Sequence, residues 1–396
     1  MPSIAIRQYW FTPFIFVTLL TSGIISCASG DQVESGLSSE QQSPMPKELP
    51  SLIKEEANVD SGNSRDVNRE SDSPADSDDK ILERKLNFIN DNEGALTREL
   101  AGTGIQQVTI DVEEYTFDAL LAGPADGIPV VLLHGFPSSN YQWRYQMISL
   151  ANAGYLVFAP NQRGYSPLAR PIGVPNYLAD LLVEDILRIT DVLEWNKFHL
   201  VGHDWGAFVA WSFAGSYPER LITLTPISVP HPEAFAIALS DPSGEQAQMS
   251  GYMNFFRQAG SENTFLANNA ELLKGIYQSA DLSETEMEPY LEVLGTPDAL
   301  SAALNWYRAN NFSPDLLEGA ERRTGVPDIQ LPTMHIWSSD DTALGRQGAE
   351  LTAQFVSGDY RYEVFEGVNH WVTEVASEAL NTVLIDFISS YTSEHG

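Results

Sequence analysis

Residues 201–207 read VGHDWGA, with an aspartate, Asp204, between two glycines. The stretch just before it, FHLVGH (198–203), has the pattern of a buried strand, and GAFVAWSFAGSYP (206–218) has the pattern of a helix. A Gly-x-Asp-x-Gly frame between a strand and a helix predicts a tight turn that presents the central side chain above the edge of a sheet. The N-terminus of the following helix would stabilise the charge of Asp204. The stretch therefore predicts a displayed carboxylate that can act as a nucleophile.

Strands and helices alternate on both sides of this turn. Short apolar runs typical of strands occur at 129–135, 155–160, 221–228, 333–338 and 360–367. Helical patterns cover 177–195 and 378–391. Such alternation predicts an α/β fold with a mainly parallel sheet that helices cover on both faces.

The alternation lapses between about residues 229 and 325. The pattern there is helical and rich in aromatic residues and methionine. This predicts a helical cap inserted into an α/β core, whose two parts are residues 81–228 and 326–396. The first part contains 104–123, which alternates like a two-stranded hairpin.

The N-terminus carries the features of an export signal. An apolar run at 11–25 follows Arg7 and is too short for a comfortable membrane span. The residues from Ile24 to Cys27 are similar to a bacterial lipobox, so 1–27 is predicted as a signal peptide whose cysteine is lipidated. The protein would then be anchored in the cell envelope, and Ala28 favours the outer membrane. An uncleaved anchor or a plain signal peptide are the alternatives.

The segment from 28 to 80 is acidic and polar. It holds 13 Asp and Glu against 5 Lys and Arg, with no Phe, Tyr or Trp. Such a composition cannot bury enough apolar surface to offset the entropy of ordering, so a disordered linker is predicted. The whole chain has a net charge of −32, which argues against a nucleic-acid partner. Cys27 is the single cysteine, so no disulfide forms within the chain.

A nucleophile needs partners, and in this kind of fold an acid and then a histidine follow it in the chain. His370 lies just past the run at 360–367, and it alone of the seven histidines has the right order and context. The acid is Asp340 or Asp341, which follow the run at 333–338. A turn or helix cap is the other explanation for this acidic pair.

A second turn follows the run at 129–135. There the backbone N–H of Phe136 can point at the site and form an oxyanion hole with the N–H of Trp205. A plain Gly-Pro turn is the alternative for this segment.

Taken together, these motifs resemble the epoxide hydrolases of the α/β-hydrolase fold. The resemblance covers residues 105 to 393 and is carried by HGFPSSNYQWR (134–144), NQRGYSPLARP (161–171), VGHDWGA (201–207), ALNWYR (303–308) and GVNHW (367–371). It implies two cap tyrosines, Tyr252 and Tyr307, that hydrogen-bond and protonate the epoxide oxygen. It also favours Asp341 over Asp340, because related folds place the acid four residues after the aromatic that ends the strand.

The activity that the resemblance implies needs no metal or organic cofactor. Asp204 would open a small apolar epoxide to give a covalent ester, and His370, oriented by Asp341, would activate the water that releases a diol. Trp205, Trp306 and Phe136 are expected to contact the substrate.

Three residues depart from the family pattern, namely Ser166 and Ser338 where glycine is usual and Phe255 where an aromatic hydroxyl is common. They indicate a divergent branch. Haloalkane dehalogenases share the aspartate, but they commonly carry an asparagine where Phe136 stands. A surface protein of this fold without turnover is the third hypothesis.

Overall fold

The computed structural model describes residues 78–89, 93–310 and 324–392. The predicted signal peptide with Cys27 and most of the predicted linker lie outside these residues, so both stay predictions. The first described element, helix α2 (Asp78–Lys85), begins two residues before the predicted end of the linker at residue 80. In the described part of the chain, no helix combines the length and the apolar character that a membrane crossing requires.

A nine-stranded sheet forms the centre of the described region, with the order β1-β2-β3-β5-β4-β6-β7-β8-β9. Strands β1 to β3 are antiparallel to their neighbours, and the strands from β5 to β9 run parallel to one another. The predicted α/β class with a mainly parallel sheet is confirmed. The strands are β1 (Asn87–Phe88), β2 (Gln106–Val112), β3 (Tyr115–Ala122), β4 (Pro129–Leu133), β5 (Leu156–Pro160), β6 (Phe198–His203), β7 (Leu221–Ile227), β8 (Thr333–Ser338) and β9 (Tyr360–Phe365).

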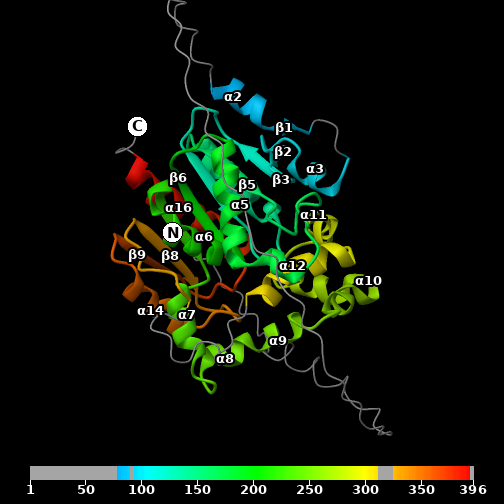
Figure 1. Cartoon of the computed structure of the whole chain (residues 1–396), viewed down its shortest axis with the longest axis vertical. Helices are drawn as coiled ribbons and strands as arrows, with labels where there is room; N and C mark the ends of the chain where they lie inside the picture. The colour runs from blue at the N-terminus through cyan, green and yellow to red at the C-terminus, as the bar shows by residue number, and fades with distance from the viewer. Residues whose placement is uncertain (1–77, 90–92, 311–323, 393–396) are drawn as a thin grey trace, which may run out of the picture. The chain divides into compact units, whose positions relative to one another are not determined.

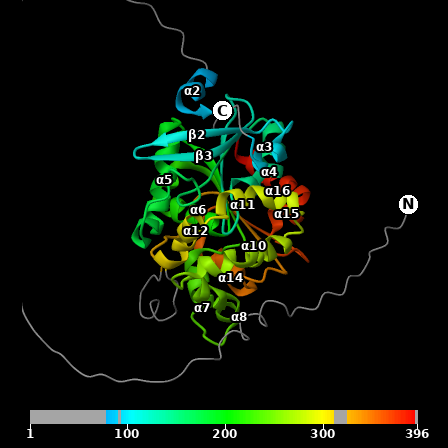
Figure 2. The same cartoon turned by 90° about the vertical axis from the view of Figure 1, so that its right-hand side faces the viewer.

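Helices cover both faces of this sheet. Helix α5 contacts α6 on one face, and α4 contacts α16 on the other, as Figure 2 shows with α5 to the left of the sheet and α4 and α16 to its right. All residues of β5, β6 and β7 are buried, which fits strands covered on both sides. The helices of the core are α3 (Ala95–Leu100), α4 (Arg144–Asn152), α5 (Ala179–Val192), α6 (Trp205–Ser216), α14 (Arg346–Leu351), α15 (Val372–Val375) and α16 (Ser377–Thr392), with short 3₁₀ helices η1 (Asn140–Trp143), η2 (Val174–Tyr177), η3 (Pro218–Arg220) and η5 (Thr352–Phe355).

A run of helices separates β7 from β8, where the sequence predicts the cap. These are α7 (Pro232–Leu239), α8 (Glu245–Met249), η4 (Ser250–Tyr252), α9 (Met253–Phe256), α10 (Ser261–Gln278), α11 (Glu284–Leu294) and α12 (Pro297–Ala309). Figure 1 shows α9 to α12 grouped to one side of the sheet. Helix α12 contacts η2 and α11 contacts α3, so the cap rests on the core at two separate places.

Local signals explain where the cap helices begin. Ser283 and Glu286 form a reciprocal capping box at the start of α11, which satisfies two backbone N–H groups that would otherwise lack partners. The Thr296 hydroxyl accepts the backbone N–H of Ala299 at the start of α12, and Pro297 occupies the first helical position, where its missing N–H costs nothing. These starts fix where α11 and α12 stand over the carboxyl edge of the sheet.

Candidate active site

The turn around Asp204 is a strained junction between β6 and α6. Asp204 has φ +52° and ψ −122°, a conformation that non-glycine residues rarely adopt and that costs about 1–3 kcal/mol. The flanking glycines are required by space: a Cβ at Gly202 would collide with the carbonyl of Gly206, and a Cβ at Gly206 with the carbonyl of Leu133. The predicted Gly-x-Asp-x-Gly turn is therefore present, and its centre is strained.

Two backbone N–H groups hold the Asp204 carboxylate. The N–H of Phe136 donates to Oδ1 at 2.8 Å, and the N–H of Trp205 also donates to this carboxylate. Burial raises the pKa of Asp204, while the charge of His370 and these two hydrogen bonds oppose that rise. The donors predicted for an oxyanion hole thus already converge on the carboxyl group where an oxyanion would form.

His370 and Asp341 complete a charged line behind Asp204. His370 Nδ1 lies 2.8 Å from Asp341 Oδ2, and its Nε2 lies 3.6 Å from Asp204 Oδ2. Asp341 is buried and its Oδ1 accepts the N–H groups of Ala343 and Leu344 at 2.8 and 3.0 Å. The structure therefore puts Asp341, and not its neighbour, against the histidine.

Asp340, the alternative acid, is exposed and accepts a hydrogen bond from the Ser339 hydroxyl. Burial disfavours the charge of Asp341, yet the charge and hydrogen bond of His370 outweigh burial and lower the Asp341 pKa. Asp341 is therefore ionised and can orient the imidazole of His370.

The imidazole of His370 is a stronger base than usual. Burial opposes its protonation, but the charge and hydrogen bond of Asp341 and the charge of Asp204 outweigh burial and raise the pKa to about 9. At neutral pH the free site therefore holds an imidazolium between two carboxyl groups. The contribution of Asp204 to this pKa exists only while Asp204 carries its charge.

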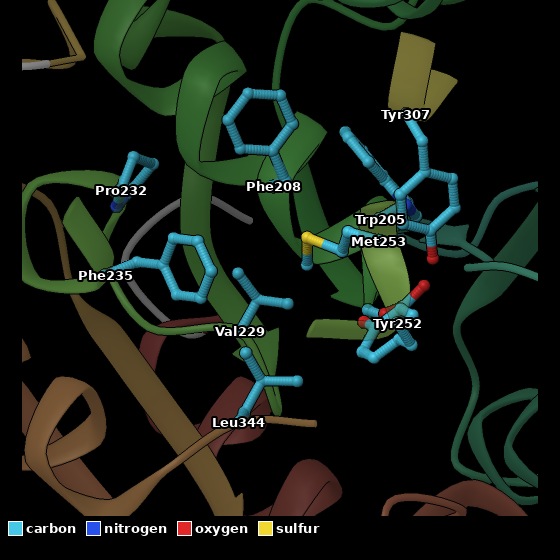
Figure 3. Close-up of a pocket in the computed structure, with 10 residues that line it drawn as sticks. Trp205, Phe208, Val229, Pro232, Phe235, Tyr252, Met253, Tyr307 and Leu344 are labelled. Carbon is cyan, nitrogen blue, oxygen red and sulfur yellow. The ribbon is translucent and has the colours of Figure 1, made fainter. Parts of the chain in front are cut away.

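Tyr252 and Tyr307 face Asp204 from the cap. Tyr252 ends η4 and Tyr307 lies on α12, and Arg257 links the two segments through a hydrogen bond to the Tyr307 carbonyl at 3.2 Å. Figure 3 shows the two hydroxyls pointing toward one another, and a side-chain hydrogen bond joins them. Burial raises the pKa of both phenols far above neutrality, so both keep their protons. Each is therefore able to donate a hydrogen bond to a ligand.

Asp204, Tyr252 and Tyr307 line one cavity. Its polar lining comes from Asp204, Tyr252 and Tyr307, and the remaining side chains are apolar (Figure 3). The apolar lining consists of Trp205, Phe208, Val229, Pro232, Phe235, Met253 and Leu344. A cavity with this lining fits a small apolar ligand with one polar reacting group.

The structure places two of the three residues expected to contact the substrate away from the cavity lining. Trp306 does not line the cavity: it is 1% exposed, its indole donates to the Arg163 carbonyl at 2.9 Å, and its ring lies behind Trp205. The Phe136 ring does not line it either, because it packs against Phe256 and Tyr307. Both rings are buried in the packing between cap and core, and Trp205 is the one of the three that lines the cavity.

A chain of hydrogen bonds beneath the site was not predicted. Gln142 accepts the N–H of Gly135 at 3.3 Å and contacts His203 Nδ1 at 3.4 Å, and His203 Nε2 lies 2.9 Å from the His370 carbonyl oxygen. Burial lowers the pKa of His203 to about 3, so its ring is neutral. His203 therefore links the two loops that carry the oxyanion donor and the base.

Apart from Trp205, the apolar lining was not predicted. Val229 follows β7, Pro232 and Phe235 lie on α7, and Leu344 follows Asp341, but single apolar residues at such places carry no distinctive sequence signal. Their position just past the carboxyl ends of parallel strands is the signal that could have found them. No group of three or more His, Cys, Asp and Glu side chains able to hold a metal ion occurs among the described residues.

Comparison with known proteins agrees with this geometry. The profile of the alpha/beta hydrolase fold family matches residues 128–376. Human "Epoxide hydrolase 4" is 32% identical over 287 residues, which cover 70% of this chain and 76% of the relative. The "AB hydrolase superfamily protein YfhM" of Bacillus subtilis is 31% identical over 292 residues, which cover 72% of this chain and 99% of the relative.

Among solved structures, epoxide hydrolase A from Mycobacterium thermoresistibile superposes with a TM-score of 0.62 at 26% identity, over 72% of this chain and 98% of the other. The fold, the strained turn and these relatives define the class. The chain belongs to the α/β-hydrolase family, and it is a hydrolase.

Proposed function

We propose that the protein hydrolyses a small apolar epoxide to a vicinal diol through an ester of Asp204. The observation that carries this proposal is the position of one carboxylate and two protonated phenols on the same cavity. A carboxylate attacks an epoxide carbon, and the oxygen that departs needs a proton donor on the opposite side. The human relative and the solved mycobacterial protein are both named epoxide hydrolases, which supports the same activity.

The first step opens the ring. An oxygen of Asp204 forms a bond to an epoxide carbon, the C–O bond of that carbon breaks, and its electron pair goes to the epoxide oxygen. Tyr252 and Tyr307 hydrogen-bond this oxygen, and one of them supplies its proton. The product is an ester between Asp204 and a β-hydroxyalkyl group.

The second step hydrolyses the ester, and a fall in the pKa of His370 makes this step possible. Esterification removes the charge of Asp204, which is one of the causes that raise the His370 pKa to about 9. The imidazole then gives up its proton, which restores the phenol of the tyrosinate, and the neutral imidazole can accept a proton from water. Water adds to the Asp204 carboxyl carbon, and the N–H groups of Phe136 and Trp205 hold the oxyanion. The acyl C–O bond breaks, the alkoxide takes a proton from His370, and the diol leaves. The acid proton left on Asp204 then passes to His370, which restores the carboxylate and the imidazolium.

The surroundings of Trp205 favour oxygen over halogen as the departing atom. A halide leaving group needs N–H donors, and the side chain of Trp205 donates its hydrogen bond to Tyr307. The phenols, with pKa values raised by burial, suit an alkoxide that must be protonated.

A substrate panel tests the proposal. The protein is incubated with aryl and alkyl epoxides and with haloalkanes, and diol and halide are measured by chromatography. Diol formation that is lost in Asp204→Ala is the expected result. Halide release without any diol would contradict the proposal.

A further inference from the structure

The loop that carries His370 is fastened to the cap on both sides of the histidine. The side-chain amide of Asn369 donates to the Ser279 carbonyl at 2.9 Å, and the indole of Trp371 donates to the Ser279 hydroxyl at 2.8 Å. Ser279 is the residue that ends helix α10 of the cap. His370 therefore lies between two residues that both hydrogen-bond to Ser279 of the cap.

Glu374, on the short helix α15 that follows this loop, makes a second connection to the cap. Its side chain is 3% exposed and forms an ion pair with Arg144, with nitrogen–oxygen distances of 2.8 and 2.7 Å. The hydroxyl of Tyr290, on cap helix α11, donates to the same carboxylate at 2.5 Å. A buried carboxylate that is ion-paired and hydrogen-bonded in this way has little freedom to move.

The same part of the cap also reaches the loop that carries the oxyanion donor. The hydroxyl of Tyr277, near the end of α10, donates to the Pro137 carbonyl at 2.8 Å. Pro137 directly follows Phe136, whose N–H binds Asp204. The rings of Tyr277 and Tyr290 stack with centroids 5.1 Å apart, so the two connections support each other.

These three cap residues lie apart from the groups that would open the epoxide. Tyr277, Ser279 and Tyr290 do not line the cavity, whereas Tyr252 and Tyr307 do. Their contacts reach the loops of His370 and Phe136, the two groups that act on the ester. The backbone of Asp204 is fixed by the strained turn between β6 and α6, and its carboxylate accepts the N–H of Trp205 as well as that of Phe136.

We propose that Tyr277, Ser279 and Tyr290 form a brace, a set of positioning residues through which the cap sets the rate of ester hydrolysis separately from ring opening. This inference rests on the proposed function. Water must lie between His370 Nε2 and the Asp204 carboxyl carbon, and a misplacement of about 1 Å can cost about 10²-fold in rate. Loosening the brace therefore slows the step that depends on His370 and leaves attack by Asp204 intact.

Two single variants test the brace. Tyr290→Phe removes one hydrogen bond to Glu374 and leaves its ion pair with Arg144, and Ser279→Ala removes the acceptor of the Trp371 indole. Single-turnover kinetics with an epoxide, followed by mass spectrometry of the enzyme, measure ring opening and ester hydrolysis separately. Each variant is expected to hydrolyse the ester about tenfold more slowly, with ring opening unchanged within about twofold. The ester then accumulates during turnover.

Tyr155→Phe is the matched control. It removes the hydrogen bond of 3.0 Å between the hydroxyls of Tyr155, just before β5, and Thr392, at the end of α16. Neither residue lines the cavity. Both rates should equal those of the wild type. Equal slowing of both steps in the brace variants, or no change in either, would overturn the proposal.

A measurement without substrate separates this proposal from the proposed function. The proton on His370 Nδ1, which faces Asp341 at 2.8 Å, gives a low-field NMR signal when the bond is well ordered. The brace variants should broaden or lose this signal, and Tyr155→Phe should keep it. An unchanged signal would overturn the brace even in an enzyme that makes diol. A wild type that makes no diol, with the signal lost only in the brace variants, would contradict the proposed function and leave the positioning role of the brace supported.

Discussion

The two sides of the cavity are built in different ways. On the core side, Asp204, Asp341 and His370 follow the carboxyl ends of β6, β8 and β9, and backbone N–H groups and charges fix them. On the cap side, Tyr252 and Tyr307 stand on helices and are held by aromatic packing with Phe256 and Trp205. In the proposed reaction, this difference separates two roles: the core carries the charged groups, and the cap supplies the proton.

The largest effect is expected from the core nucleophile. Asp204→Ala removes the group that forms the ester, so diol formation should fall by more than about 10⁴-fold. Circular dichroism and thermal unfolding provide the control, because alanine keeps a Cβ at this strained position and the fold should be retained. Diol formation close to the wild-type rate would break the assignment of Asp204.

Removal of the base should stop the reaction halfway. In His370→Asn the ring still opens but the ester is hydrolysed about 10²–10⁴-fold more slowly, because water lacks its general base. Mass spectrometry should find close to one substrate equivalent bound to each protein chain. An unmodified chain after incubation with a true substrate would show that His370 acts before the ester forms.

The cap tyrosines should affect the other half of the reaction. Tyr252→Phe and Tyr307→Phe should each slow ring opening by about 10²-fold, since one of two donors to the developing alkoxide is lost. The double variant should be slower than either single variant, and ester hydrolysis should not change. Stopped-flow tryptophan fluorescence can follow ring opening, because Trp205 lies beside Tyr307. Slowed ester hydrolysis would contradict the division between cap and core.

The pKa of His370 links the two steps of the proposed reaction. It is raised to about 9 partly by the charge of Asp204, so Asp204→Asn should lower it, as measured by NMR titration of the imidazole. The raised pKa also means that the ion pair stabilises the fold fully below the ordinary value of 6.5 and that this contribution is lost as pH rises through about 9. Thermal unfolding of the wild type and of Asp204→Asn between pH 6 and 10 should therefore converge at high pH. An identical His370 pKa in both proteins would contradict the coupling.

The smallest effect is expected at Trp306. Trp306→Phe removes one hydrogen bond to the Arg163 carbonyl behind the site, which should cost about 1 kcal/mol of stability. The KM for an epoxide should change by less than about threefold. A rise in KM of more than tenfold would instead support the direct contact between Trp306 and the substrate that the sequence predicts.

The core of the site could be predicted from the sequence because local rules determine it. A glycine on each side of Asp204, between a strand and a helix, predicts the turn, and chain order singles out His370. The order of residues left Asp340 and Asp341 open, and the family resemblance favoured Asp341. The path of the loop after β8 shows that Asp341 is the carboxylate buried against the histidine.

The cap was less accessible to such reasoning. Its helical character could be predicted, yet which side chains of a helix face a cavity depends on how helices pack on the core. Trp306 and Tyr307 are adjacent in the chain, but Tyr307 lines the cavity and Trp306 lies behind Trp205. The brace of Tyr277, Ser279 and Tyr290 likewise depends on contacts between segments about 80 to 140 residues apart.

Isotope labelling of Asp204 tests the central claim most directly. Several turnovers in H₂¹⁸O should place ¹⁸O in the carboxyl group of Asp204, because water attacks the enzyme's own ester carbonyl and not the epoxide. The peptide that contains Asp204 should then gain mass, and the diol from a first, single turnover should carry the unlabelled oxygen of the enzyme. Diol formation with an unlabelled Asp204 peptide and ¹⁸O in the first diol would contradict the account.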